Sequence, residues 1–368
     1  MKGLDVLLLY MLQQLNGERT VSSCYHILTG RKSTQAIQDA ELFGFSAFYG
    51  LLQDLSRHDY DRTVSCLSLA GYLSRQEKDR FLVTKAARSG LKQQLTNLRF
   101  FERAFKWKQT GRTMQDIRRF WGRFQLLGQV ISYYLAGAAR YQPAISDMHI
   151  QIWVKSFWKG IKDKHHFARE WVHSLTQHLS EFDDDLLAHL LLDRLSGYKV
   201  AGYTYKQLEH RYGIPEVFVR IYTLQAAATL YMLSQKRATL FTRLTEENRR
   251  EEAGLMQSAL ETYRLLRRGH TLEEIANLRG LKQSTIEDHV IDIAIHNPDF
   301  DYRQFISDDV MKAVRQVSKR LQTKRIRPIK EHLPDDISYF QIRLALVKGE
   351  EHETGEPQGN DELRGGKG

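Results

Sequence analysis

Apolar residues recur at every third or fourth position along most of this chain, which is the spacing of one face of an α-helix. The first such stripe covers residues 4–15, and a later one covers residues 126–134. A strand pattern is confined to residues 71–84, where a polar turn separates two short apolar runs. The sequence therefore predicts a mainly α, multi-domain helical protein.

Residues 1–95 are expected to form an N-terminal domain of short helices followed by a β-hairpin. Gly30 is predicted to end one of these helices, and a further helix is predicted over residues 45–55. A last helix follows the hairpin over residues 85–95. This order resembles a winged helix, although a generic α+β cap would give a similar pattern.

Residues 96–252 show no strand pattern and are expected to form a helical middle domain. Near residues 183–232 the pattern is that of a second helix-turn-helix. A short helix is followed by a turn at Gly213, and Pro215 can then open a long third helix.

Residues 253–348 carry the clearest motif and are expected to form a C-terminal domain. Thr271 can cap a helix with Glu274 three residues on, a capping box, and Gly280 then makes a turn. Ser284 is predicted to cap the next helix, which lies in the recognition position of a helix-turn-helix.

The charge of the chain is unevenly distributed. Lys and Arg total 54 against 44 Asp and Glu, a formal net charge of +10, which favours a polyanionic partner. Residues 96–180 hold 14 basic and 5 acidic residues, whereas residues 253–348 hold 16 and 13. Residues 349–368, rich in Gly and Glu, are expected to form a disordered acidic tail. Most of the positive excess therefore lies away from the clearest motif.

A run of basic and aromatic residues follows the expected N-terminal domain. Its candidate phosphate contacts are Arg99, Arg103, Lys106, Lys108, Arg112, Arg118, Arg119 and Arg123. The interleaved aromatic residues are Phe100, Phe101, Phe105, Trp107, Phe120, Trp121 and Phe124. Single-strand binders pair such cations with rings that stack on bases. The alternative is a pair of amphipathic helices whose aromatic residues are core and whose basic residues face water.

In a helix-turn-helix, side chains at the start of the third helix reach the base edges. The candidate DNA-binding residues there and in the turn are Arg279, Lys282, Gln283, Ser284, Thr285 and Asp288. Further candidate phosphate contacts are Lys324, Arg325 and Arg327. Because carboxylates such as Glu287 and Asp288 lower the affinity for phosphates, the same surface also fits a protein-docking role.

We expect no enzymatic activity, cofactor, metal or small-molecule substrate. The segment nearest to a nucleotide-binding loop, Gly30 to Ser33, lacks the Gly-Lys order that cradles phosphates. The histidine-rich segment 165–173 and the acidic run 181–185 each lack a second ligand cluster. No apolar run reaches about 18 residues, so no membrane span is expected. Cys24 and Cys66 form no paired motif, which fits a reducing cytoplasm.

Two segments together resemble a known domain, TYRLLRRGHTLEEIANLRGLKQSTIEDHV (262–290) and RIRPIKEHLPDDISYFQIRLALV (325–347). They are similar to the helix-turn-helix domain at the C-terminus of some bacterial RecQ-type helicases. The same domain ends the YpbB family, stand-alone proteins of Gram-positive bacteria encoded next to a short RecQ-like helicase. The length of the chain and the segment YHILTGRKSTQAIQDA (25–40) also resemble that family.

This resemblance implies a non-enzymatic accessory protein of a RecQ-type helicase, acting in DNA repair or recombination. We expect it in the cytoplasm, and association with the nucleoid stays open. Its partners would be the helicase, DNA or both. Two alternatives stay open. One is a helix-turn-helix transcriptional regulator that reads an operator, and the other is a protein–protein adaptor without direct DNA contact.

Overall fold

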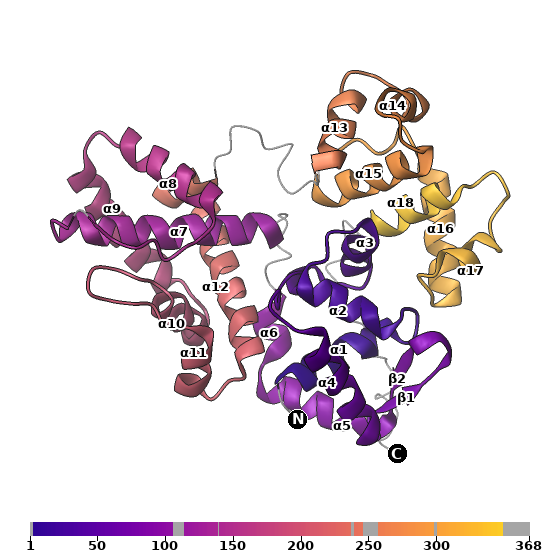
Figure 1. The fold of residues 1–368 in the computed structure, drawn as a ribbon, viewed down its shortest axis with the longest axis horizontal. Coiled ribbons are helices and arrows are strands. Elements are labelled where there is room, and N and C mark those ends of the chain that lie inside the picture. Colours follow the sequence, from indigo (N-terminus) through magenta and orange to yellow (C-terminus); the bar gives the residue numbers. More distant parts are fainter. Residues whose placement is uncertain are drawn as a thin grey trace, which may run out of the picture. The chain divides into compact units, whose positions relative to one another are not determined.

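The computed structural model describes residues 3–105, 114–138, 140–236, 239–245, 257–297 and 300–348. The fold is mainly α-helical, as the periodicity of the sequence predicts (Figure 1). The chain divides into two compact units, residues 1–299 and 300–368. The finer domain boundaries expected near residues 95 and 252 stay predictions.

The first unit begins with three helices. Helix α1 (Gly3–Leu15) is buried over most of its length, α2 (Val21–Thr29) packs against it, and α3 (Thr34–Leu42) packs against α2. Gly30 ends α2 with a φ of 71°. A Cβ atom at Gly30 would lie 2.9 Å from the Cα of Gly50, so glycine is required there both for its conformation and for this close approach.

The helix predicted over residues 45–55 is wrong. Within that stretch Ser46–Phe48 forms one 3-10 turn, η1, and Phe48 is fully buried. The next helix, α4 (Arg57–Leu69), begins after Ser56, whose hydroxyl caps it. The apolar residues of 45–55 therefore belong to a buried connection between helices.

The predicted β-hairpin is confirmed. Strands β1 (Leu73–Arg75) and β2 (Phe81–Val83) pair antiparallel, with Leu73 opposite Val83. Helix α5 (Lys85–Asn97) follows directly after the second strand. The order of helices, hairpin and helix is thus as expected, while the assignment to the winged-helix class stays a prediction.

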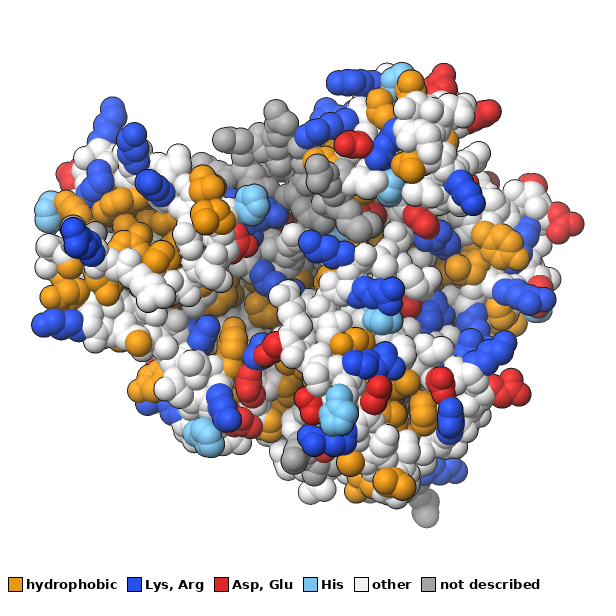
Figure 2. All heavy atoms as spheres, viewed as in Figure 1, with side chains coloured by type: hydrophobic (Ala, Val, Ile, Leu, Met, Phe, Trp, Pro, Cys, Tyr) orange, Lys and Arg blue, Asp and Glu red, His pale blue; other side chains and the backbone are white. Residues whose placement is uncertain are grey.

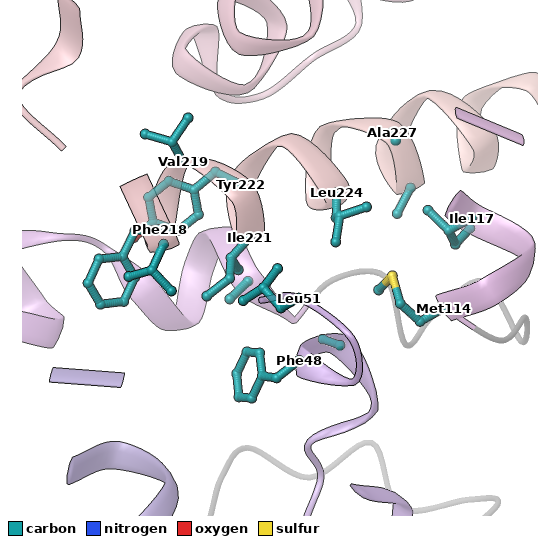
Figure 3. Close-up of a cluster of buried hydrophobic side chains, with 14 of the residues drawn as sticks. Phe48, Leu51, Met114, Ile117, Phe218, Val219, Ile221, Tyr222, Leu224 and Ala227 are labelled. Carbon is teal, nitrogen blue, oxygen red and sulfur yellow. The ribbon is translucent and has the colours of Figure 1, made fainter. Parts of the chain in front are cut away.

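Helix α12 (Glu216–Lys236) is the centre of the first unit. It packs against α1 and against most helices between residues 100 and 245. Figure 3 shows its apolar side chains directed toward Phe48 and Leu51 at one end and toward Met114 and Ile117 at the other. The surrounding elements are α6 (Phe100–Ala104), α7 (Met114–Leu135), α9 (Lys164–Ser180), α10 (Asp185–Asp193), α11 (Tyr205–Tyr212) and the 3-10 segment η4 (Leu240–Thr245), and α8 (Met148–Gly160) packs on α7.

Among the described residues, α12 is the one helix long and apolar enough to cross a membrane by length and composition. Its apolar stretch is 89% buried inside the protein. A helix that is apolar on all sides and enclosed by other helices is typical of the core of a folded domain.

The second helix-turn-helix pattern, expected near residues 183–232, corresponds to α10, α11 and α12. Gly213 makes the predicted turn with a φ of 64°. The third helix, however, is α12, which is buried from Val217 at its start onward. Because a helix inside the core cannot enter a DNA groove, this unit does not read DNA through its third helix.

Three helices complete the described part of the first unit, α13 (Gln257–Leu266), α14 (Leu272–Arg279) and α15 (Gln283–His296). The second unit consists of α16 (Asp308–Leu321), α17 (Ile326–Lys330) and α18 (Tyr339–Val347), which pack against one another. Its buried side chains include Val314 and Ile342. The tail expected over residues 349–368 lies outside the described residues.

Candidate nucleic-acid interface

Helices α13, α14 and α15 form the helix-turn-helix that the sequence predicts. The hydroxyl of Thr271 accepts the N–H of Glu274, and the Glu274 carboxylate accepts the N–H of Thr271, so the capping box is confirmed. Gly280 ends α14 in the left-handed conformation, with a φ of 61°. Ile275 and Ile286 are fully buried in one small apolar cluster that joins α14 to α15.

Helix α15 begins two residues earlier than the sequence predicts, at Gln283. Its N-cap is Lys282, which makes no side-chain capping bond, so the cap predicted at Ser284 is wrong. The Lys282 carbonyl instead accepts the N–H groups of Thr285 and Ile286. The side chains of Lys282, Gln283 and Ser284 are consequently left exposed at the start of the helix.

The remaining two candidates on α15 are less accessible. Thr285 and Asp288 are both half-buried. The amide Nε2 of Gln283 donates to Oε1 of Glu287 at 3.3 Å, so part of the acidic charge is engaged within the helix. The exposed end of α15 thus offers one cation, Lys282, and neutral groups that can both donate and accept hydrogen bonds.

Arg279 holds the helix-turn-helix together. Its Nη1 donates to the Ser258 carbonyl at 2.7 Å and to Oγ1 of Thr262 at 2.6 Å, and its Nη2 donates to Oε2 of Glu261 at 2.9 Å. The side chain is 12% exposed. These bonds join the end of α14 to α13, so a contact with DNA would require Arg279 to leave its partners.

His289 lies beneath this cluster. Oγ1 of Thr262 forms a 2.8 Å hydrogen bond with its Nδ1, and burial together with the charge of Arg279 lowers the pKa of His289. A neutral imidazole is therefore favoured in the interior of the unit. Ser258 and Thr262 are not among the candidates predicted from the sequence. Thr262 is a polar residue on the buried face of α13, and a polar residue among the apolar positions of this helix could have indicated such a role.

The later half of α15 is held against α3. Nδ1 of His296 lies 3.0 Å from Oδ1 of Asp292, and Asp292 is fully buried. Burial alone would lower the pKa of His296, but the hydrogen bond and the charge of Asp292 raise it above its usual value. Because this end of α15 is enclosed, the exposed surface of the helix is its first turn.

The downstream phosphate candidates belong to the second unit. Lys324 and Arg327 are exposed, and Arg325 is half-buried at the start of α17. Nε of Arg327 lies 3.3 Å from Oε1 of Glu331. Their contact with phosphates stays a prediction.

The basic run of residues 99–123 does not form a single exposed surface. Lys106, Lys108 and Arg112 lie outside the described residues. Arg103 and Asp184 form an ion pair with Nε and Oδ2 2.7 Å apart, and their side chains are 14% and 12% exposed. The prediction that Arg103 contacts phosphates is therefore wrong, because its guanidinium is paired with a carboxylate inside the fold.

Arg118 and Arg123 are also directed inward. Arg118 donates to the carbonyl of Tyr49, while Arg123 donates to the carbonyl of Leu244 at 2.8 Å and lies over the ring of Trp153. Burial lowers the pKa of each guanidinium to about 10. They therefore link α7 to distant segments of the chain and are not available to a phosphate.

The aromatic residues of this run are mainly core residues, as the second interpretation of the pattern predicts. Phe100, Phe120, Trp121 and Phe124 are each at most 5% exposed. Phe124 stacks on Trp171 with ring centroids 4.8 Å apart. Phe101 and Phe105 keep partial exposure, and Trp107 lies outside the described residues.

Two cations of the run remain near the surface. Arg99 is exposed and pairs with Glu102 three residues on, and Arg119 is half-buried with Asp116 at 4.0 Å. Each is thus partly neutralised by a neighbouring carboxylate. Within the described ranges, no three His, Cys, Asp or Glu side chains gather as a metal site requires.

Comparison with known proteins identifies relatives of this chain. Residues 258–346 match a protein family described as a helix-turn-helix domain, a class of domain that suggests nucleic-acid binding. Over 347 residues the chain is 30% identical to Protein YpbB of Bacillus subtilis (strain 168), a match that covers 94% of this chain and 97% of that protein. No solved structure matches the chain significantly.

We expect Arg103→Met to lower the free energy of unfolding by about 3 kcal/mol, because the Asp184 carboxylate would stay buried without its cation. Arg99→Met removes an equal charge from an exposed pair and should change stability by less than about 0.5 kcal/mol. Denaturant unfolding followed by circular dichroism measures both. Equal effects of the two variants would contradict the interior position of Arg103.

A second pair of variants distinguishes a residue that holds the helix-turn-helix together, Arg279, from an exposed candidate for DNA contact, Lys282. Arg279→Lys keeps the charge but cannot reach Ser258, Glu261 and Thr262 together, so stability should fall by about 1–2 kcal/mol. Lys282→Gln removes an exposed charge and should leave stability within about 0.5 kcal/mol of the parent. Thermal unfolding of the two variants checks this, and an unchanged Arg279→Lys protein would argue against the positioning role.

Proposed function

This chain belongs to the YpbB family, and we propose that it is a non-enzymatic protein that binds DNA and works with a RecQ-type helicase in DNA repair or recombination. The exposed first turn of α15 is the observation that carries the DNA-binding part of this proposal. It lies in the recognition position, and it begins with a cation followed by Gln283 and Ser284.

The physical basis of this binding is mainly electrostatic. The partial positive charge at the start of a helix attracts phosphate, and Lys282 adds a full charge at the same end. The amide of Gln283 can bind adenine in the major groove once it leaves Glu287. One cation and one amide are few contacts, so we infer that sequence selectivity is weak and that phosphate contacts dominate affinity.

The helicase part of the proposal rests on the two resembling segments, residues 262–290 and 325–347. The first forms the second half of α13, all of α14 and the first part of α15, and the second forms α17 and α18. The chain carries no glycine-rich phosphate loop of the P-loop type. Any ATP-driven unwinding would therefore be done by the partner, in the cytoplasm where the chromosome is located.

A second candidate function, a protein–protein adaptor, is favoured by one exposed side chain. Leu278 on α14 is 64% exposed. Its helix carries two acidic residues, Glu273 and Glu274, in its first turn. An exposed leucine beside carboxylates fits a protein surface better than a DNA backbone.

DNA binding can be tested on the full chain by fluorescence anisotropy with duplex, forked and single-stranded DNA over a range of salt concentrations. We expect affinity to fall steeply with salt. The double change Lys282→Gln and Gln283→Ala should weaken binding about tenfold, the loss of one phosphate contact and one amide contact. Lys206→Gln, an exposed lysine on α11, is the matched control and should bind like the parent.

The absence of binding at low salt would exclude the DNA-binding function. Selection from random duplexes gives a further distinction. Enrichment of a single motif, lost in the double variant, would favour the transcriptional regulator over the helicase accessory protein.

The helicase partnership can be tested by co-purification of the full chain with a RecQ-type helicase from the same organism. If α14 contacts the helicase, Leu278→Ser should reduce the amount of recovered helicase severalfold and leave the DNA affinity unchanged. Leu69→Ser on α4, where the side chain is 89% exposed, is the control and should have no effect. No recovery with the unaltered chain would argue against a direct partnership.

A further inference from the structure

A stretch without acidic residues crosses the hairpin and α5. Residues 80–101 contain Arg80, Lys85, Arg88, Lys92 and Arg99 but no Asp or Glu. The positive charge of this stretch is therefore not cancelled along the sequence.

The structure places three of these cations on one side of α5. Lys85, Arg88 and Lys92 are all exposed, and at 3.6 residues per turn they fall within a sector of about 60°. Leu91 and Leu95 are buried, and α5 packs on α1, which fixes the orientation of the helix. We call Lys85, Arg88 and Lys92 the α5 cation row.

None of the three cations pairs with an acid in the part of the chain that the structure describes. Arg88 donates from Nε to the carbonyl of Val83 at 3.2 Å, which anchors its guanidinium at the end of β2 and leaves the side chain exposed. The hydroxyl of Thr84 caps the helix, so its start needs no carboxylate. The row thus combines a fixed backbone with unpaired charges.

The exposed cations of α4 and those over α8 and α9 have different surroundings. On α4, Arg57 pairs with Asp61 and Arg62 lies 3.5 Å from Asp59. Over α8 and α9, Lys and Arg side chains are interleaved with hydrophobic ones (Figure 2), and Ile152 is 61% exposed there. Those surfaces are neutralised or partly apolar, which suits a protein contact better than a polyanion.

We propose that the α5 cation row is a second, sequence-independent contact with the phosphate backbone of DNA, distinct from α15. From Lys85 to Lys92 the helix rises about 10 Å, at 1.5 Å per residue. Three cations over this length can face about three phosphates of one DNA strand. This inference rests on the proposed DNA-binding function and adds the site that supplies its electrostatic part.

The test compares two full-length triple variants of equal charge change. Lys85→Gln, Arg88→Gln and Lys92→Gln remove the α5 cation row, whereas Lys155→Gln, Lys159→Gln and Lys162→Gln remove three exposed lysines from α8 and the turn after it. The measurement is the slope of log affinity against log salt concentration for a fluorescent duplex. Each lost phosphate contact lowers the magnitude of this slope by about 0.9, so the row variant should lose about 2–3.

The control variant should keep the parental slope. An equal loss in both triple variants would mean that net charge alone acts, and an unchanged slope in the row variant would overturn the proposal. Because Arg88 also contacts the backbone, the double variant Lys85→Gln with Lys92→Gln is measured too, with an expected loss of about 2 and an unchanged melting temperature.

The outcome also separates this inference from the proposed function. If the unaltered chain binds no DNA at low salt, the DNA-binding function itself fails. If the α15 variants weaken binding while the row variant keeps its slope, the function stands and this inference falls. Loss of helicase recovery by the row variant with an unchanged salt slope would assign the row to an acidic protein surface and overturn the proposal.

Discussion

The requirement to enclose α12 organises the first unit of this protein. Most of its side chains are apolar or small, and burial of each large apolar one contributes about 1.5–3 kcal/mol relative to exposure. A single neighbouring helix cannot cover such a surface, so several elements between α1 and η4 pack against it. The sequence pattern of α12 resembles the third helix of a DNA-binding helix-turn-helix. In the structure, α12 is instead the core helix around which the other helices pack.

Enclosing α12 also decides what the basic residues of α6 and α7 do. Once these helices pack on α12, Arg103, Arg118 and Arg123 face inward, where a guanidinium has to be hydrogen-bonded to be tolerated. Asp184 and the carbonyl of Leu244 supply those bonds from distant parts of the chain. The most basic region of the sequence therefore contributes fewer surface charges than its composition implies, and a less conspicuous segment, α5, keeps its charges exposed.

The helix-turn-helix shows the same division within one helix. The first turn of α15 is exposed, whereas its later half carries the buried Asp292 and His296 and packs on α3. Buried polar groups that are fully bonded fix one orientation more strictly than apolar contacts do. Arg279, Thr262 and His289 act in this way between α13, α14 and α15, so the polar residues near the turn position the recognition helix.

Features that depend on neighbouring residues could be predicted from the sequence alone: the helical class, the hairpin, the capping box at Thr271 and the left-handed turns at Gly30 and Gly280. These follow from backbone conformation and local hydrogen bonds, which a few residues specify. Periodicity shows that a helix has a buried side, but it does not show what covers that side. Arg123 and its partner Leu244 are 121 residues apart. Which cations are interior and which are exposed could be seen only once the chain was folded, because burial depends on contacts between segments that are distant in the chain.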